Sequence, residues 1–511
     1  MAGPAGTSPT LPAMSSQQGR GTGIRSRGGP LVIAIDIGSS SVRAELFDAD
    51  GRSRRRSFCQ VPYLPTVDGR GGVSVEFPRL LAVVASTLDA FVARAGADLG
   101  RVTGVGISCF LHSLAATDAT GRAITPLLTW ADTSSAGEAA ELRTRLDGPE
   151  LWQETGAPLH ASYWPAKIVH LRRSMRTSPR GWAGAPELLY RELTGARATD
   201  LSQASGTGLL DRRTGTWHRG LLDALDLRAA ALPEIAAQNS WARLTGWAAT
   251  RWPALGRIPW FSPWSDASCG NVGLGCLAGG AAALQIGTSG AVRAILADPV
   301  PAIPAGLFGH RLADGTALVG GQLSEGGGVA AAVARLLGRS MRGLEAEAAT
   351  LPPDGHGLTV LPYLAGERGP GYHDAARGVL AGLSLGSSRA EVFLAVIEAV
   401  ALDFAALDRR LAMASGGPAR IVASGGALAR SPLLVEILAA ALGRPIEASE
   451  EGEASSRGAA ILALAAGGTI GSPADIPPPA TRQVVPDPDR VVRYRAAVAR
   501  QADLYRRILE S

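Results

Sequence analysis

The phrase Ile37-Gly38-Ser39-Ser40-Ser41-Val42-Arg43-Ala44 has a near copy further along the chain, Ile286-Gly287-Thr288-Ser289-Gly290-Ala291-Val292-Arg293-Ala294. Each copy closes a run of small apolar residues, which is the pattern of a strand entering a tight turn. Glycine lets backbone N–H groups converge on an anion, and the neighbouring hydroxyls add donors. Two such turns facing each other could hold a polyphosphate from both sides. The duplication therefore predicts a two-domain nucleotide clamp.

The composition fits two large globular domains that act on a small molecule. The 511 residues exceed what one hydrophobic core usually holds, and 46% are hydrophobic while 19% are charged. The formal net charge is only +5. The one dense basic cluster, Arg52 with residues 54–56, follows a hairpin-like turn and is better explained as a solvated strand edge than as a nucleic-acid contact. We therefore expect no nucleic-acid partner.

Cysteine usage and hydropathy favour a cytoplasmic protein. The four cysteines form no Cys-x-x-Cys pair and the seven histidines have no ligand-like spacing, so neither a disulfide framework nor a zinc site is expected. No apolar run reaches about 18 uninterrupted residues. The Gly-, Pro- and Ser-rich opening, residues 1–29, is expected to be a disordered leader because it lacks the apolar core of a secretory signal. We expect no membrane partner, and a homodimer is an open alternative.

Hydrophobic periodicity predicts alternating strands and helices, which is typical of an α/β architecture with covered sheets. Helices are expected over residues 80–95 and 138–146, and a buried strand over 102–108. The second phrase restarts the strand-loop-strand pattern. This divides the chain into an N-terminal domain of residues 30–271, a C-terminal domain of 272–476, and a linker with a final helix over 477–511. Ser388 and Glu391 fit a capping box that opens a long helix.

Phosphoryl transfer needs a phosphate cradle, a carboxylate for Mg²⁺, a base for the acceptor and a nucleoside pocket. Asp36 ends an apolar strand, where a carboxylate is costly to bury unless it faces a cation. Asp266 precedes the domain boundary and would face an interdomain cleft as a general base. Spacing alone leaves a turn aspartate equally open there. The Gly425-Gly426 turn could admit a flat purine close to the backbone.

Lysine is almost absent from this chain. Among the 50 basic residues, Lys167 is the only lysine and all others are arginine. A strong bias toward arginine makes a surviving lysine a candidate for a role that suits a compact ammonium. Chance survival is the alternative explanation.

Together these residues resemble the FGGY carbohydrate kinases, whose two domains have the ribonuclease-H-like fold of actin and hexokinase with a catalytic cleft between them. The resemblance covers residues 31 to about 467. It rests on the two phosphate phrases, on the segment 424–431 with 453–459 behind it, and on Gly366-Glu-Arg-Gly-Pro-Gly-Tyr-His-Asp-Ala-Ala-Arg-Gly378 before the capped helix. Within the family the sequence is most similar to that of the gluconate kinases, notably at residues 108–114, 128–132, 155–160, 163–167 and 200–211.

The resemblance implies an ATP-dependent transfer to a primary hydroxyl, with ATP and Mg²⁺ as cofactors, Asp266 as catalytic base and Asp36 as the metal-associated carboxylate. Gluconate would be the favoured acceptor and 6-phosphogluconate the product. The implied acceptor residues are His112, Trp130, Asp132 and Lys167, since a sugar acid offers hydroxyls and a carboxylate. The implied nucleotide residues are Gly38, Ser39, Ser40, Ser41, Arg43, Gly287, Thr288, Ser289, Gly425, Gly426 and Ala427.

Two alternatives stay open. The gluconate-kinase pattern has arginine two residues after Asp132, and this chain has Ser134. The acceptor could therefore be a pentulose or a polyol. A sensor that binds sugar and nucleotide without turnover is the alternative from a different class.

Overall fold

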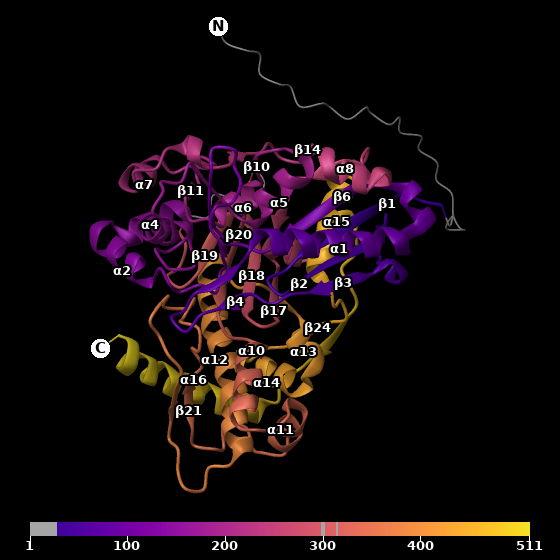
Figure 1. Cartoon of the computed structure of the whole chain (residues 1–511). Coiled ribbons are helices and arrows are strands. Elements are labelled where there is room, and N and C mark those ends of the chain that lie inside the picture. The colour runs from indigo at the N-terminus through magenta and orange to yellow at the C-terminus, as the bar shows by residue number, and fades with distance from the viewer. Residues whose placement is uncertain (1–27, 298–301, 313–314, 511) are drawn as a thin grey trace.

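The structure is a computed structural model that describes residues 28–297, 302–312 and 315–510. The predicted leader therefore lies outside the described residues, apart from its last two. The chain forms two domains, the N-terminal one above the C-terminal one in Figure 1. This arrangement agrees with the expected two-domain α/β fold.

Each domain is built on one seven-stranded mixed sheet. The N-terminal sheet has the order β14 (Trp241–Ala242), β15 (Trp260–Phe261), β6 (Val102–Cys109), β1 (Leu31–Ile37), β2 (Ser41–Asp48) and β3 (Cys59–Pro62), with β16 (Trp264–Ser265) also pairing β6. The C-terminal sheet has the order β19 (Phe308–Arg311), β20 (Thr316–Leu323), β18 (Gly290–Ala297), β17 (Ala281–Ile286), β23 (Arg420–Ser424), β24 (Ile446–Ser449) and β25 (Thr481–Val484).

The two sheets share one topology. Strand β1 runs antiparallel to β2 and parallel to β6, and β17 runs antiparallel to β18 and parallel to β23. The two copies of the repeated phrase occupy the same place in this scheme, at the turns β1–β2 and β17–β18. The sequence duplication is therefore a structural duplication, as the ribonuclease-H-like prediction requires.

Helices cover the sheets, and short strand pairs lie outside the main sheets in both domains. The helices of the N-terminal domain are α1 (Phe77–Ala95), α2 (Ala136–Arg145), α3 (Gly148–Thr155), α4 (Trp164–Ser174), α5 (Ala185–Thr194), α6 (Leu201–Ser205), α7 (Arg219–Ala224), α8 (Gly246–Arg251) and α9 (Asp266–Gly273). The helices of the rest of the chain are α10 (Gly327–Leu336), α11 (Met341–Ala348), α12 (Arg389–Ser415), α13 (Gly426–Arg430), α14 (Pro432–Leu442), α15 (Ala454–Ala466) and α16 (Pro488–Leu509). The short strands include β5 (Val73–Val75), β8 (Leu127–Leu128), β7 (Ala115–Thr117), β9 (Gly181–Ala183), β21 (Thr359–Leu361) and β22 (Val379–Ala381).

Helix α1 is apolar because it is a core helix. Among the described residues, the helical segment 77–101 has the length and composition to cross a membrane. Its apolar side chains, however, pack on β2 and β3, with Leu80, Val84, Leu88 and Phe91 fully buried. Burial against the sheet accounts for the hydrophobicity of this helix.

The capped helix forms as predicted. Ser388 Oγ accepts a hydrogen bond from the Glu391 amide at 3.2 Å, and the Glu391 carboxylate accepts one from the Ser388 amide at 2.7 Å. The box satisfies two amides that would otherwise lack partners at the start of α12. Helix α12 runs for 27 residues and packs against β18, β20 and α14.

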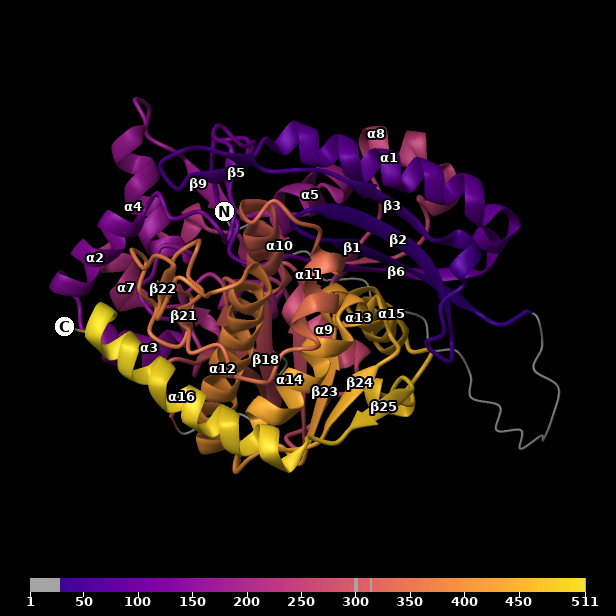
Figure 2. The same ribbon diagram turned by 90° about the horizontal axis from the view of Figure 1, so that it is seen from below.

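The segment predicted as a linker with a final helix does more than connect. It contributes β25, which pairs antiparallel with β24 at the sheet edge. Helix α16 then runs along the C-terminal domain (Figure 2), where Tyr494 donates to Glu398 at 2.7 Å and Tyr505 donates to Glu367 at 2.8 Å. The sequence pattern missed the edge strand because prolines flank it on both sides.

Helices α9 and α15 join the two domains by direct backbone contact. The predicted boundary at residue 271 falls inside α9, and α15, which follows the second sheet in sequence, packs on β1 and β6 of the first domain (Figure 1). A Cβ atom on Gly458 would lie 1.8 Å from the Cys269 carbonyl oxygen, and one on Gly273 would lie 1.9 Å from the Ala454 carbonyl oxygen. Only glycine permits this approach.

We predict that Gly458→Ala separates α9 from α15. The added methyl group meets backbone that no rotamer change can move, so the free energy of unfolding should fall by about 2–3 kcal/mol and the thermal midpoint by several degrees. Thermal unfolding of the purified variant measures this. Gly137→Ala in α2 is the matched control, because a Cβ there meets nothing within 4 Å. Equal midpoints for the two variants would contradict the contact.

Candidate active site

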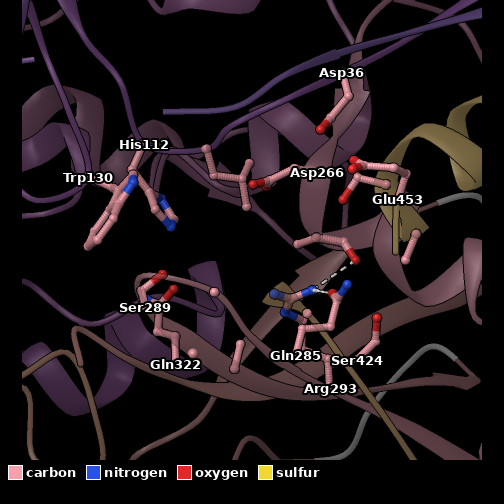
Figure 3. Close-up of a pocket in the computed structure, with 18 of the residues that line it drawn as sticks. Asp36, His112, Trp130, Asp266, Gln285, Ser289, Arg293, Gln322, Ser424 and Glu453 are labelled. Carbon is pink, nitrogen blue, oxygen red and sulfur yellow. Dashed lines mark hydrogen bonds between the residues drawn. The ribbon is translucent and has the colours of Figure 1, made fainter. Parts of the chain in front are cut away.

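A cavity of about 290 Å³ lies between the two domains. Its wall includes eight of the residues predicted from sequence, namely Asp36, Arg43, His112, Trp130, Asp266, Gly287, Ser289 and Gly425. Figure 3 shows the carboxylates of Asp36 and Glu453 on one side and the rings of His112 and Trp130 on the other. The cavity thus has an acidic end and an aromatic end, with Asp266 between them.

Two helices begin at the cavity wall. Asp266 and Ala267 open α9, and residues 452–455 lead into α15. The Ser265 side chain caps α9 by accepting from the Ser268 amide at 3.1 Å. The first turns of helices carry unpaired amides and a partial positive charge, which favour an anion. The glycine contact between α9 and α15 therefore brings two such helix starts to one cavity.

Asp266 is a carboxylate in a low-dielectric wall. Burial raises its pKa to about 6, and the neighbouring Asp36 charge adds to the rise while the Arg293 guanidinium opposes it. A carboxylate with a pKa near 6 is ionised at neutral pH and is a stronger base than an ordinary aspartate. Asp266 is therefore chemically suited to accept a proton from an alcohol.

Asp36 belongs to a small charged network at the acidic end. One carboxylate oxygen accepts from Ser108 Oγ at 2.7 Å and the other from an Arg43 guanidinium nitrogen at 2.8 Å. Arg43 also pairs with Glu453 at 3.1 Å, and burial raises the pKa of Glu453. The network links β1, β2 and the start of α15, so it ties the first phosphate turn to the second domain.

The second phosphate turn has the same design with one charge removed. Gln285 on β17 stands where Asp36 stands on β1, and Arg293 on β18 donates to its side-chain oxygen at 2.9 Å. Arg293 also donates to the Ala267 carbonyl at 3.2 Å. The first copy thus carries an aspartate–arginine pair and the second a glutamine–arginine pair.

The acidic end suits a divalent cation that arrives with phosphates. Among the described residues, the one cluster of three ligating side chains close enough to hold a metal by itself is Asp354, His356 and Glu398, and none of these lines the cavity. Mg²⁺ is commonly held by one or two carboxylates plus substrate phosphates and water. Asp36, with Asp266 and Glu453 on the same cavity wall, matches that pattern.

His112 presents an acceptor nitrogen at the aromatic end. Its Nδ1 lies 2.6 Å from the Gly206 carbonyl oxygen, which can only accept, so Nδ1 carries the proton and Nε2 is the acceptor. Burial holds the pKa of His112 well below its ordinary value, and the Arg368 charge adds to this. The ring packs edge-on to Tyr163, with centroids 4.7 Å apart. A neutral imidazole fixed in this way can accept a hydrogen bond from a hydroxyl.

Asp132 and Lys167 do not line the cavity, which corrects the expectation that both contact the acceptor. Asp132 accepts from the Val73 amide at 2.8 Å and from Ser134 Oγ at 2.6 Å. Lys167 is fully buried, and its Nζ donates to the carbonyls of His112 at 2.7 Å and Thr129 at 2.6 Å. Lys167 therefore braces the backbone at His112 and next to Trp130, and Asp132 ties the loop that follows Trp130 to β5.

The remaining predicted nucleotide residues flank the cavity without being part of its wall: Gly38, Ser39, Ser40, Ser41, Thr288, Gly426 and Ala427. They belong to the two phosphate turns and to the start of α13. Gly425 has a φ of +115°, and a Cβ there would lie 2.4 Å from the Ile286 carbonyl oxygen. That turn therefore packs against the end of β17, and only glycine fits.

Sequence reasoning did not single out four polar wall residues, Gln285, Arg293, Gln322 and Arg368. Arg293 occupies the same place in the second copy of the repeated phrase as Arg43 does in the first. Arg368 lies inside the segment 366–378. The duplication itself was the signal for Gln285. Gln322 had no signal, because a glutamine late in a strand carries no pattern of its own.

Sequence profiles of one family match most of the chain. The N-terminal domain profile of the FGGY family of carbohydrate kinases matches residues 31–273, and the C-terminal domain profile matches residues 282–467. The first match ends with α9, which begins at the cavity wall, and the second begins in β17.

Individual relatives differ in the acceptor that their names carry. A gluconokinase of Bacillus subtilis is 26% identical over 86% of this chain and 88% of its own length. A glycerol kinase of Gloeobacter violaceus is 28% identical over 84% and 87%. A solved xylulose kinase of Lactobacillus acidophilus superposes with a TM-score of 0.86 at 24% identity, covering 94% of this chain and 99% of its own. The fold is therefore shared across kinases of different acceptors.

We predict that Lys167 makes the stability of this protein rise with pH. Burial lowers its pKa to about 7, whereas an unfolded lysine titrates at about 10.4. Between these values the unfolded chain binds an extra proton, so Lys167 adds up to about 1.4 kcal/mol of stability per pH unit. Thermal unfolding of wild type and Lys167→Met at pH 7 and pH 9 tests this. Relative to the variant, wild type should gain several degrees at pH 9, and a pH-independent difference would contradict the buried titration.

Proposed function

Because this chain belongs to the FGGY family of carbohydrate kinases, we propose that it transfers the γ-phosphoryl group of ATP to a primary hydroxyl of a sugar acid, with gluconate as the favoured acceptor and 6-phosphogluconate as the product. The observation that carries the proposal is the position of Asp266, in one cavity between the paired phosphate turns and the His112–Trp130 end. The free, buried cysteine thiols of this protein suit the reducing conditions of the cytoplasm, where we propose that the protein acts.

In the proposed complex the triphosphate lies at the acidic end. The turns at Gly38–Ser41 and Gly287–Ser289 would offer amides and hydroxyls, and the starts of α9 and α15 would add their partial positive charge. The purine would lie against the Gly425–Ala427 turn. Mg²⁺, associated with Asp36, would neutralise charge on the phosphates when bound.

The proposed chemical step needs one base and one aligned hydroxyl. Asp266 accepts the proton of the acceptor's primary hydroxyl while that oxygen forms a bond to the γ-phosphorus and the bond to the β,γ-bridging oxygen breaks, releasing ADP. Arg293 lies beside Asp266 and would stabilise charge on the transferring group. Closure of the two domains would exclude water, which otherwise competes with the acceptor.

The acceptor end supports a polyhydroxylated chain. His112 Nε2 can accept from one hydroxyl, Trp130 offers an apolar face, and Gln322 offers an amide. We assign Asp132 and Lys167 a positioning role, since each holds backbone next to His112 or Trp130 and neither reaches the cavity.

Because a glycerol kinase and a xylulose kinase are also similar to this chain, a polyol or a pentulose is the alternative acceptor. Either alternative would use the same phosphate residues and differ at the aromatic end. A sensor without turnover is disfavoured because Asp36 and Asp266 are both present on the cavity wall.

We predict that gluconate is turned over. Purified protein with Mg²⁺ and ATP should release ADP in a coupled assay when gluconate is added, and much more slowly with D-xylulose, glycerol or no acceptor. Faster turnover of D-xylulose or glycerol would replace gluconate as the acceptor. Tight binding of sugar and nucleotide without ADP release would favour the sensor instead.

We predict that Asp266→Asn folds and binds ADP but loses phosphoryl transfer by roughly 10²–10⁴-fold, the usual contribution of a general base. In wild type, kcat/KM should rise with pH through about 6, because the pKa of Asp266 is raised to about 6 and only the ionised form accepts a proton.

Asp200→Asn is the matched control for this pH profile. Burial also raises the pKa of Asp200 to about 6, but Asp200 caps α6 and does not line the cavity. Asparagine can serve as a cap equally well. The control should therefore keep both the turnover and the rise near pH 6. If Asp266→Asn kept near-native turnover, the proposed mechanism would be wrong.

A further inference from the structure

The cavity contains a buried guanidinium that forms no ion pair with a carboxylate of the described residues. Arg368 follows Glu367 in the loop between β21 and β22 and lines the cavity with only 8% of its surface exposed. Its guanidinium donates to the Gln322 side-chain oxygen, and its Nε is buried without a hydrogen-bond partner. Across the described residues, no carboxylate oxygen lies within 4.0 Å of it. Burying an unpaired charge is costly, so the site is prepared for an anion.

The other two cavity arginines have different surroundings. Arg43 is neutralised by Asp36 at 2.8 Å and Glu453 at 3.1 Å. Arg293 has no ion pair within the part of the chain described, but it is bonded to Gln285 and Ala267 next to Asp266, where the triphosphate would bring negative charge. Arg368 forms no ion pair with a described residue, and the carboxylates of Asp266 and Glu325 act on its charge only from beyond 4.0 Å.

Arg368 lies at the aromatic end of the cavity. Its guanidinium carbon is 4.6 Å from the centroid of the Trp130 ring, a cation–π geometry that fixes the plane of the fork. Gln322, which accepts from Arg368, donates in turn to the Tyr163 hydroxyl at 3.2 Å. The charge of Arg368 also lowers the pKa of His112. The guanidinium therefore belongs to the acceptor half of the cavity, with Trp130 and Gln322 beside it.

The loop that carries Arg368 is held from behind. The Glu367 side chain accepts from the Gly371 amide at 2.5 Å, from the His373 amide at 3.2 Å and from Tyr505 of α16 at 2.8 Å. A guanidinium kept in place by packing and by a second layer of hydrogen bonds loses little freedom when it binds a planar anion.

We propose that Arg368 binds the carboxylate of the acceptor and sets the preference for a sugar acid over a neutral sugar. This rests on the proposed function. A guanidinium offers two parallel N–H donors that match the two oxygens of a carboxylate. Arg368 takes the carboxylate-binding role that the sequence suggested for Lys167, because the Lys167 ammonium donates to backbone carbonyls instead. Since Arg368 comes from the C-terminal domain and His112 from the N-terminal one, a bound sugar acid bridges the domains.

Gluconate and gluconamide form the test pair, because they differ only in the charge of the terminal group. Affinity for each is measured by calorimetry on the whole protein in the presence of a non-hydrolysable ATP analogue. Wild type should prefer gluconate over gluconamide by about 10- to 100-fold, the usual effect of a charge-assisted pair. In Arg368→Gln that ratio should fall to near one, mainly through weaker gluconate binding, and Arg368→Lys should lie between.

Arg377→Gln is the matched control. Arg377 lies in the same loop, is exposed and donates to the Ala376 carbonyl, away from the cavity. It should keep the wild-type ratio. ADP binding to Arg368→Gln checks that the variant is folded, and Arg368→Lys carries the test if it is not.

The outcomes separate the two proposals. If wild type turns over gluconate and Arg368→Gln keeps the wild-type preference, Arg368 is not the carboxylate site and the proposed function stands. If wild type neither binds nor phosphorylates gluconate, the proposed acceptor is wrong and the role of Arg368 falls with it.

Discussion

Backbone contact between α9 and α15 is the constraint on which the site depends. Gly458 and Gly273 let the two helices approach until a methyl group would collide with a carbonyl oxygen, and Gly106 on β6 does the same toward Ala459, where a Cβ would lie 2.2 Å from its carbonyl oxygen. Helix α15 is thereby embedded in the first domain although it follows the second sheet in sequence. Its start carries Glu453 and the start of α9 carries Asp266. A shared cavity between two domains follows from that packing.

The two copies of the repeated turn differ in one residue that faces their arginine. Both turns place an arginine next to the strand end, but the first opposes it with Asp36 and the second with Gln285. A second buried carboxylate here would repel Asp266 and, in the proposed complex, the triphosphate. Replacing it with an amide keeps the hydrogen bond and removes the repulsion. The asymmetry leaves one side suited to a cation and the other to an anion.

The acceptor half is assembled from residues far apart in sequence, and its polarity comes from burial. His112 is neutral because the cavity wall excludes water. Burial lowers the pKa of Arg368 as well, but a guanidinium stays protonated in proteins. Behind them, Lys167 and Asp132 brace the loop backbone through hydrogen bonds. Recognition in such a site depends on two layers, since the side chains that touch a ligand are only as well placed as those that hold them.

The sequence alone determined the two-domain α/β fold, the duplicated glycine turns, the cap of α12 and the candidates Asp36 and Asp266, because each has a local signature in glycine, hydroxyl or carboxylate residues at strand and helix ends. It could not tell which cation faces the cavity. Lys167 was conspicuous as the sole lysine, yet its side chain points into the domain core, while Arg368 was one arginine among many. Tertiary packing decided between them, because the direction of a side chain and its neighbours depend on contacts between segments hundreds of residues apart.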